Sequence, residues 1–179
     1  KTINKQIKLI EKLVNEFSDF ARMPKPIFKK NELNKIIKDT INLMKTNDKD
    51  IVINFHSEIN YFVNSDNEQL NRVFINLFKN SIESLKEKHE KMGNFQKKID
   101  VEITLINDYI NIEVQDNGMG FTNNDLKIFS KPYFTTKKDG SGLGLSIVEK
   151  ILSDHNGFIE FIPKKEGAKI KILLPKYVN

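Results

Sequence analysis

The sequence contains no cysteine, and its three histidines, His56, His89 and His155, lie far apart. Without cysteine the chain forms neither a disulfide nor a thiolate metal site, and isolated histidines do not favour a histidine-based zinc site. No run of about 18 or more apolar residues is present, which predicts no membrane-spanning helix, and the start does not resemble a signal peptide. We expect a cytoplasmic fragment of a larger protein, whose anchoring in the inner membrane is left open.

Arginine is rare. Lysine and arginine together number 29 against 24 aspartates and glutamates, which gives a net charge of +5. Nucleic-acid binding is one interpretation of a pI near 9.2. The lysines are spread along the whole chain, however, and aromatic and basic residues do not alternate in the way that binds single strands. We interpret the charge as a compositional bias toward lysine, asparagine and isoleucine, and we predict no nucleic-acid partner.

A chain of 179 residues, 39% of them hydrophobic and 30% charged, can form one globular domain with a small appendage. Residues 1–22 are predicted to form a helix, because apolar residues recur at alternating steps of four and three, as in helix bundles. Pro24 and Pro26 end this helix, since each disfavours helical backbone in the preceding residue. The apolar stripe of this helix consists of Ile3, Ile7, Ile10, Val14, Phe17 and Ala21. A stripe this wide needs a partner helix.

The remaining patterns predict an α+β fold. Helical spacing predicts helices over 32–45, from the N-cap Asp66 to about residue 91, and over 142–155, with a short helix at 122–129. Apolar and polar alternation predicts strands over 51–56, 61–64, 99–106, 109–115, 157–162 and 168–174, with a hairpin turn at Asn107-Asp108. Because strands and helices do not alternate as βαβ units, we predict a two-layer sandwich. Its mostly antiparallel sheet is covered by helices on one face and preceded by one long helix.

Five of the eight glycines lie in two short runs, residues 116–120 and 140–145. Glycine has no Cβ and lets the backbone approach a ligand closely. Asp116 ends a strand with a buried face, where its carboxylate can accept a hydrogen bond from an exocyclic amine. Gly118 and Gly120 would let the chain turn under a flat base. The alternative is an ordinary Asp-Asn-Gly turn.

Two asparagines precede both glycine runs on a predicted helix. Asn76 and Asn80 are four residues apart and therefore share one face, beside the apolar stripe and next to Lys79. An amide oxygen can coordinate Mg²⁺, which takes few protein ligands in addition to phosphate oxygens and water. The alternative is a solvated polar face in an asparagine-rich chain.

The second glycine run, 140–145, lies where a helix is predicted to begin. Backbone N–H groups at a glycine-rich helix start bind phosphate well. The run matches neither the Walker motif nor the dinucleotide-binding and protein-kinase glycine motifs. The alternative is a flexible loop that ends in a helix.

The segment between the two runs is predicted to form a lid. Residues 129–137 combine aromatic residues, two threonines and lysines, and Lys137 can meet a terminal phosphate as a point charge. We expect residues 130–141 to be mobile without nucleotide, because few apolar residues anchor them. The alternative is a surface loop with two buried aromatic residues.

The order and spacing of these motifs resemble the catalytic ATP-binding domain of sensor histidine kinases. The matching segments are 76–80 for the N-box of that family, 116–120 for its G1 box, 129–137 for its F-box, 140–145 for its G2 box and Gly167-Ala168 for its final glycine box. Residues 17–24 resemble the end of the second dimerisation helix in nitrogen-regulation-type kinases, the NtrB/NtrY class.

The resemblance implies the fold shared by gyrase, heat-shock chaperone, histidine kinase and mismatch-repair ATPases. It also implies three segments: a dimerisation-domain remnant over 1–23, a linker over 24–27 and a catalytic ATP-binding domain over 28–179.

The resemblance implies that the chain binds ATP and Mg²⁺. It assigns adenine recognition to Asp116 and the metal to Asn80. It makes Asn76, near the phosphates, and Lys137, near the γ-phosphate, the implied catalytic residues. The implied nucleotide-binding set is Asn76, Lys79, Asn80, Asp116, Gly118, Gly120, Phe134, Thr135, Thr136, Lys137, Gly140, Ser141, Gly142, Leu143, Gly144 and Leu145.

The implied reaction is transfer of the γ-phosphate of ATP to a histidine on a dimerisation helix. The implied partners are that helix of the same or a partner protomer, a response regulator, and a second copy in a homodimer. None of the three histidines has the family's His-Glu or His-Asp context, so we expect the acceptor outside this chain. Ser141 stands where the family more often has threonine, which keeps the hydroxyl.

Asn76 separates phosphate transfer from hydrolysis. In hydrolysing members of the superfamily a glutamate one turn before the metal-binding asparagine activates water, and a neutral amide cannot act as a general base. We therefore expect slow hydrolysis. Two alternatives stay open: an ATPase of the same superfamily and a non-catalytic nucleotide-sensing module.

Overall fold

The computed structural model describes residues 21–47, 50–121 and 142–178, together with scattered positions between 7 and 18. Its main sheet has five strands in the order β2-β4-β5-β7-β6, and β1 pairs with β3 in a separate small sheet. In the main sheet β2 runs parallel to β4, and every other neighbouring pair is antiparallel. The strands are β1 (Lys29–Glu32), β2 (Ile51–Ser57), β3 (Phe62–Ser65), β4 (Lys97–Ile106), β5 (Tyr109–Asp116), β6 (Phe158–Pro163) and β7 (Ala168–Pro175).

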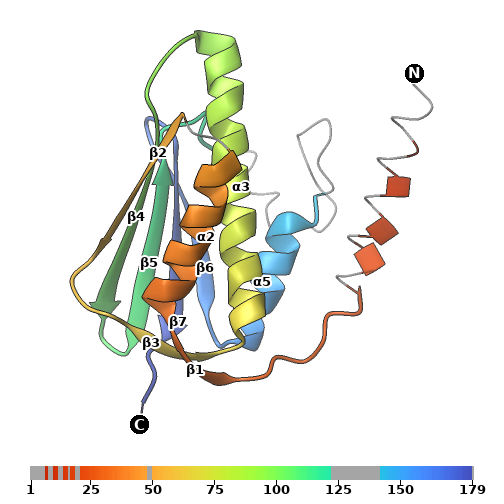
Figure 1. Ribbon diagram of the computed structural model, residues 1–179, viewed down its shortest axis with the longest axis vertical. Helices are drawn as coiled ribbons and strands as arrows, with labels where there is room; N and C mark the ends of the chain where they lie inside the picture. The colour runs from red at the N-terminus through yellow and green to blue at the C-terminus, as the bar shows by residue number, and fades with distance from the viewer. Residues whose placement is uncertain are drawn as a thin grey trace.

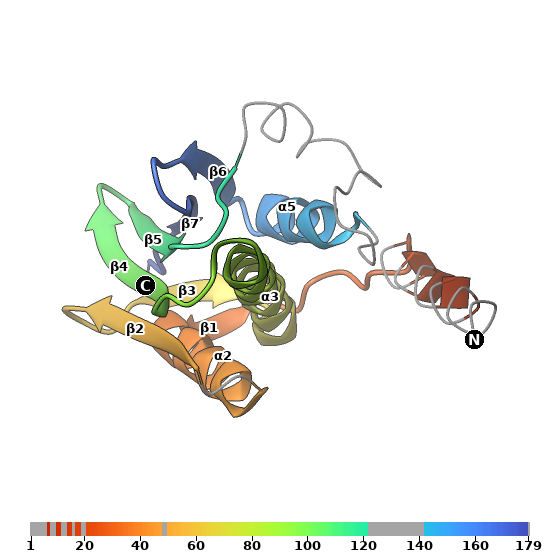
Figure 2. The same cartoon turned by 90° about the horizontal axis from the view of Figure 1, so that it is seen from above.

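Three helices form a second layer on one face of the sheet, as Figures 1 and 2 show. They are α2 (Leu33–Asn47), α3 (Asn67–Met92) and α5 (Gly144–Asp154). The core lies between the layers, where the inward residues of β4 and β5, including Ile99, Val101 and Ile112, are fully buried. The expected α+β sandwich with a mostly antiparallel sheet is confirmed.

Helix α3 begins at the predicted N-cap. Asp66 Oδ1 accepts hydrogen bonds from the backbone N–H groups of Glu68 at 3.0 Å and Gln69 at 3.1 Å, which satisfies donors that no helical carbonyl can reach. Burial raises the pKa of Asp66, but backbone N–H groups outweigh it and hold the pKa below its ordinary value. The predicted apolar face is buried, apart from a half-buried Ile82. The buried members are Leu70, Val73, Phe74, Leu77, Phe78 and Leu85.

Two features of the sheets were not predicted. β1 was missed, because its sequence Lys-Lys-Asn-Glu shows no alternation of apolar and polar residues. β2 and β3 flank the predicted polar turn but pair with different partners, β4 and β1. The hairpin at Asn107-Asp108 is confirmed, and Asn107 has the positive φ, +55°, that tight turns require.

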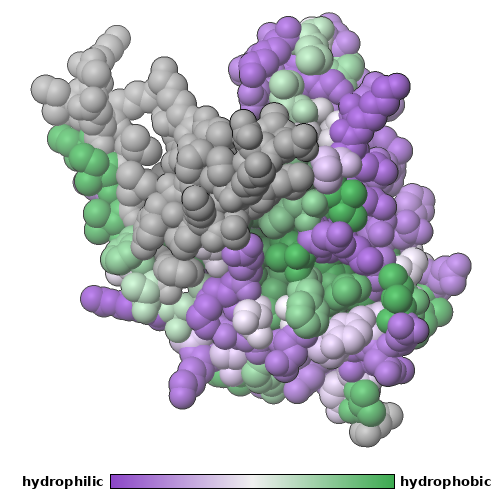
Figure 3. Space-filling model, turned by 180° about the vertical axis from the view of Figure 1, so that it is seen from behind, coloured by the Kyte–Doolittle hydropathy of each residue, from purple (hydrophilic) through white to green (hydrophobic). Residues whose placement is uncertain are grey.

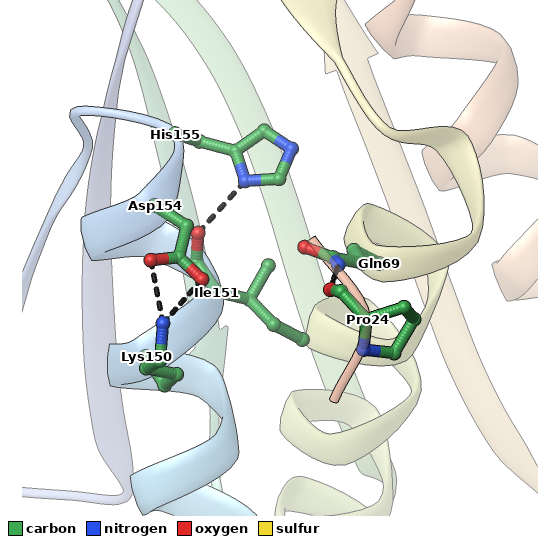
Figure 4. Close-up of polar contacts among 6 residues, drawn as sticks. All are labelled: Pro24, Gln69, Lys150, Ile151, Asp154 and His155. Carbon is green, nitrogen blue, oxygen red and sulfur yellow. Dashed lines mark hydrogen bonds and ion pairs between the residues drawn. The ribbon is translucent and has the colours of Figure 1, made fainter. Parts of the chain in front are cut away.

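The segment after the first helix lies against the start of α3 and the end of α5. Gln69 Nε2 donates to the Pro24 backbone oxygen at 2.9 Å, as Figure 4 shows, and the Ile27 N–H donates to Asp66 Oδ2 at 2.9 Å. The Phe28 ring meets His155 edge-on, with centroids 5.1 Å apart. These contacts attach the expected linker, 24–27, to the start of α3, and the residue that follows it, Phe28, to the end of α5.

The described positions of the first helix are helical and carry exposed apolar side chains. Ile7, Ile10, Val14 and Phe17 are between 48% and 59% exposed, and Figure 3 shows hydrophobic surface along this part of the chain. Within the described ranges, no helix is long and apolar enough to cross a membrane. The predicted helix at 122–129 and the predicted mobile loop at 130–141 lie outside the described residues.

Candidate nucleotide-binding site

One side of α3 faces the start of α5 through Asn76. The Asn76 Nδ2 group donates to the Arg72 backbone oxygen at 2.8 Å, one turn earlier in the same helix. A Cβ placed on Gly144 would lie 3.1 Å from Asn76 Oδ1, so glycine at this position lets the two helices approach closely. Asn76 and Asn80 are half-buried, and Lys79 is exposed. The structure thus brings two separately predicted motifs, 76–80 and 140–145, into contact.

The first turn of α5 presents backbone donors. The first intrahelical hydrogen bond runs from the Ile147 N–H to the Leu143 oxygen at 2.9 Å, which leaves the preceding N–H groups of the turn without a helical carbonyl. The N-cap residue of α5, Leu143, makes no capping hydrogen bond with its side chain, and the first turn, which the structure describes, contains no acidic residue. The helix dipole adds positive potential here, so this end favours an anion.

Leu143 and Leu145 differ in exposure. Leu143 is 1% exposed and belongs to the hydrophobic core. Leu145 is half-buried. Gly142 has a φ of +70°, which a residue with a Cβ adopts at a cost, and it lies two residues before the first residue of α5.

The loop after β5 begins with a buried carboxylate. Asp116 is 5% exposed at the end of β5, where its backbone pairs with Ile99 of β4 and Ala168 of β7. Its Oδ1 accepts a hydrogen bond from the Gly118 N–H at 2.9 Å. A central strand therefore fixes the backbone of Asp116, and the loop itself orients the carboxylate.

The β6–β7 turn closes the other side of this loop. Gly167 has a φ of +71°, and a Cβ there would overlap the Asp116 backbone oxygen and lie 2.8 Å from the Asn117 Cα. Gly120, with a φ of +79°, in turn lies against the Gly167 backbone oxygen. The three glycine motifs at 116–120, 140–145 and 167 thus each mark a close approach of backbone to a neighbouring element.

Sequence reasoning missed two residues of α3 that contact the loop. Ser84 Oγ accepts a hydrogen bond from the Met119 N–H at 2.9 Å, and Lys88 Nζ donates to the Asn117 oxygen at 2.8 Å. Their spacing of four from Asn80 continues the row Asn76, Asn80, Ser84, Lys88 along one face of α3. That spacing was the available signal, but serine and lysine on a polar helix face are too common to be noticed.

Several predicted site residues lie outside the described part of the chain. They are Phe134, Thr135, Thr136, Lys137, Gly140 and Ser141. The described ones lie on three elements: α3 with Asn76, Lys79 and Asn80, the loop after β5, and the start of α5. Within the described ranges, no group of three or more His, Asp or Glu residues could hold a metal ion. An amide oxygen such as that of Asn80 can coordinate a hard cation together with oxygens of the ligand.

Comparison with known proteins identifies a family and several relatives of this chain. The family described as "Histidine kinase-, DNA gyrase B-, and HSP90-like ATPase" matches residues 65–178. Nitrogen regulation protein NtrY of Azorhizobium caulinodans is 33% identical over 177 residues, which cover 97% of this chain and 23% of that protein. The chain spans about a quarter of the length of the curated relatives it matches.

Solved structures of similar fold include histidine kinases. The nucleotide-free catalytic domain of histidine kinase ThkA superposes with a TM-score of 0.73 at 26% identity, covering 84% of this chain and 96% of that one. ThkA in complex with the response regulator protein TrrA superposes with a TM-score of 0.77 at 25% identity, covering 98% of this chain and 50% of that one. The chain belongs to the family of histidine kinase-, DNA gyrase B- and HSP90-like ATPases, on a match that covers most of its length.

Proposed function

We propose that this chain is the ATP-binding catalytic domain of a two-component sensor histidine kinase. It transfers the γ-phosphate of ATP to a histidine on a dimerisation helix outside this chain. The observation that carries the proposal is the convergence of three elements. The buried Asp116 carboxylate ends β5, an asparagine row lies on α3, and beside Asn76 the first turn of α5 has N–H groups that no helical carbonyl reaches.

The base side of the pocket is assigned to the loop after β5. Asp116 accepts a hydrogen bond from the exocyclic amine of adenine, and its burial makes such a donor strongly preferred over an acceptor. Gly118 and Gly120 keep the backbone flat beneath the base, since a side chain at either position would meet α3 or the β6–β7 turn.

The phosphate side is assigned to α3 and α5. Asn80 would supply an amide oxygen to Mg²⁺, and Asn76 and Lys79 would lie near the phosphates. The backbone of Gly142, Leu143, Gly144 and Leu145 meets the phosphate chain at the start of α5, as a helix N-terminus favours. Gly140, Ser141, Phe134, Thr135, Thr136 and Lys137 complete the set from the lid. Bound Mg²⁺ would neutralise charge that develops on the transferred phosphoryl group.

Asn76 favours transfer over hydrolysis. Its amide nitrogen is committed to the Arg72 oxygen, and its amide oxygen packs beside Gly144. A neutral amide in this position cannot remove a proton from water. The ATPase alternative therefore has no general base at the position where hydrolysing relatives carry glutamate. Catalysis then consists of positioning and charge neutralisation.

The histidines of this chain do not suit the role of phosphoacceptor. His155 is 4% exposed, and both ring nitrogens are hydrogen-bonded, Nδ1 to Ile151 and Nε2 to Asp66. His56 lies on β2, on the sheet face away from the helices, and the Nδ1 atom of His89 is buried. The acceptor is accordingly assigned to another helix.

The proposal includes the organisation of the parent protein. Residues 1–23 are the remnant of a dimerisation domain, 24–27 a linker and 28–179 the catalytic domain. The apolar stripe of the first helix packs against a second copy in a cytoplasmic homodimer, and a response regulator receives the phosphate.

The test is phosphorylation of a separately supplied acceptor-helix domain from radiolabelled ATP and Mg²⁺. We expect the wild type to label the acceptor. Asp116→Asn should lower this labelling at least tenfold, because a neutral amide oxygen accepts a hydrogen bond more weakly than a carboxylate does. A hydrogen bond to a charged group contributes about 1.5–3 kcal/mol. Asp100→Asn is the matched control. Asp100 lies on β4, half-buried and paired with Asn54 and Lys98, but on the opposite sheet face.

Equal labelling activity of Asp116→Asn and wild type would show that Asp116 does not recognise the base. Nucleotide binding without any labelling of the acceptor would favour the non-catalytic module instead.

A further inference from the structure

Two side chains of α3 hold the loop that follows Asp116. Ser84 Oγ accepts the Met119 N–H at 2.9 Å, and Lys88 Nζ donates to the Asn117 oxygen at 2.8 Å. Ser84 and Lys88 are one helical turn apart, so they share a face of α3. The bonded residues, Asn117 and Met119, flank Gly118 on both sides. α3 therefore fixes the loop on either side of this glycine.

Gly118 transmits the position of α3 to the carboxylate. A Cβ on Gly118 would overlap Ser84 Oγ and lie 3.0 Å from Asp116 Oδ1, so the glycine is packed directly between the two side chains. Its N–H also donates to Asp116 Oδ1 at 2.9 Å. A shift of Gly118 away from Ser84 would thus move the hydrogen bond that orients the Asp116 carboxylate.

Lys88 is itself held in place. Its ammonium lies 4.9 Å from the centroid of the Phe95 ring, a favourable cation–π distance. The Asn117 side chain is bonded to the segment leading into β4: Nδ2 donates to the Gln96 oxygen at 2.8 Å, and Oδ1 accepts the Lys98 N–H at 2.9 Å. Asn117 therefore joins the loop to the sheet, and Lys88 joins the same residue to α3.

We propose that Ser84 and Lys88 are positioning residues for base recognition, because they hold the Asp116 carboxylate in the orientation that accepts an exocyclic amine. This inference rests on the proposed function, in which Asp116 recognises adenine. Both residues act through the loop and lie on the base side of the assigned site. They set the affinity for the base and the preference for an amino-purine.

The experiment compares Ser84→Ala and Lys88→Met with the matched control Lys91→Met. Lys91 lies on the next turn of α3, is exposed and pairs with Glu87 at 2.6 Å. Isothermal titration of the whole chain with Mg²⁺ uses two probes, a non-hydrolysable ATP analogue and inosine triphosphate, which has a carbonyl in place of the exocyclic amine. Thermal unfolding without nucleotide is recorded for each variant.

We expect each loop variant to bind the ATP analogue about three- to tenfold more weakly, as the loss of one hydrogen bond implies. Binding of inosine triphosphate should change less, so the preference for adenine shrinks. Lys91→Met should match wild type with both nucleotides. Equal losses for the two nucleotides, with a lowered unfolding temperature, would show a purely structural role and overturn the inference.

Loop variants that match Lys91→Met in both titrations would overturn the inference as well. A wild-type chain that binds neither nucleotide would contradict the proposed function itself, which keeps the two failures distinct.

Discussion

Single glycines decide how closely the backbone segments of the site approach one another. Gly118 lies against Ser84, Gly144 against Asn76, and Gly167 against Asp116. At Gly167 two requirements coincide, since φ is +71° and a Cβ would overlap the Asp116 oxygen. By contrast Gly93, with a φ of +86°, has no atom within 4 Å of a Cβ. The two positions separate the cost of steric overlap from the cost of backbone strain.

We predict that Gly167→Ala destabilises the fold more than Gly93→Ala does. Gly93→Ala should cost about 1–3 kcal/mol in free energy of unfolding, the usual cost of a strained backbone. Gly167→Ala should cost at least about 1–3 kcal/mol more, because overpacking forces β5 and the β6–β7 turn apart. Urea unfolding of both variants measures the difference. Equal costs would show that the β6–β7 turn relaxes freely away from Asp116.

Two helices are joined at one end by a single buried histidine. His155 follows α5 and accepts the N–H of Asp66, the N-cap of α3, through Nε2 at 3.0 Å. Nδ1 then carries the proton and donates to the Ile151 oxygen at 2.8 Å, as drawn in Figure 4. Burial lowers the pKa of His155, against the bond to Ile151 and the charges of Asp66 and Asp154, which raise it. The neutral ring is thus the one that fits.

We predict that stability falls as the pH falls below about 6.5, the ordinary histidine value. The pKa of His155 is lower in the folded chain than in the unfolded chain. In this pH window the unfolded chain therefore binds more protons than the folded chain, which lowers the free energy of unfolding. The loss has a ceiling of about 1.4 kcal/mol per pH unit and ends at the folded pKa. Urea unfolding at pH 7.5 and 5.5 measures it.

His155→Gln provides the control for this pH dependence. The variant should be less stable at pH 7.5 but lose less stability on going to pH 5.5, because the titrating ring is gone. The same pH dependence in wild type and variant would assign the effect to other groups.

The whole molecule presents an exposed apolar stripe on its first helix. Ile7, Ile10, Val14 and Phe17 are all about half exposed. Exposed apolar side chains at this spacing are typical of a helix that packs against another helix.

We predict that the chain self-associates through this stripe. Sedimentation of the wild type should show dimers that dissociate on dilution, and Ile10→Glu with Val14→Glu should shift the population to monomer, because charges cannot be buried unpaired in the seam. Ile59→Glu is the matched control, since Ile59 is 58% exposed and lies in the connection between β2 and β3. A strictly monomeric wild type would contradict the prediction, as would equal effects of the control.

The sequence by itself determined most of the described elements and their buried faces. Period-two and helical spacing are local properties of the chain, and so the hairpin at Asn107-Asp108, the Asp66 cap and the apolar face of α3 were predictable. The glycine runs and the asparagine pair were likewise visible, because their chemistry depends on residue type and spacing. Their order and spacing also supported the resemblance to sensor histidine kinases.

Only the tertiary structure decided which elements meet. The parallel pairing of β2 with β4 and the strand β1 depend on contacts between distant segments, which no local pattern encodes. The same holds for Ser84 and Lys88, which look like solvated residues of a polar helix until the loop after β5 is packed against them. Local spacing therefore names the residues that carry chemistry, whereas packing selects those that hold them in place.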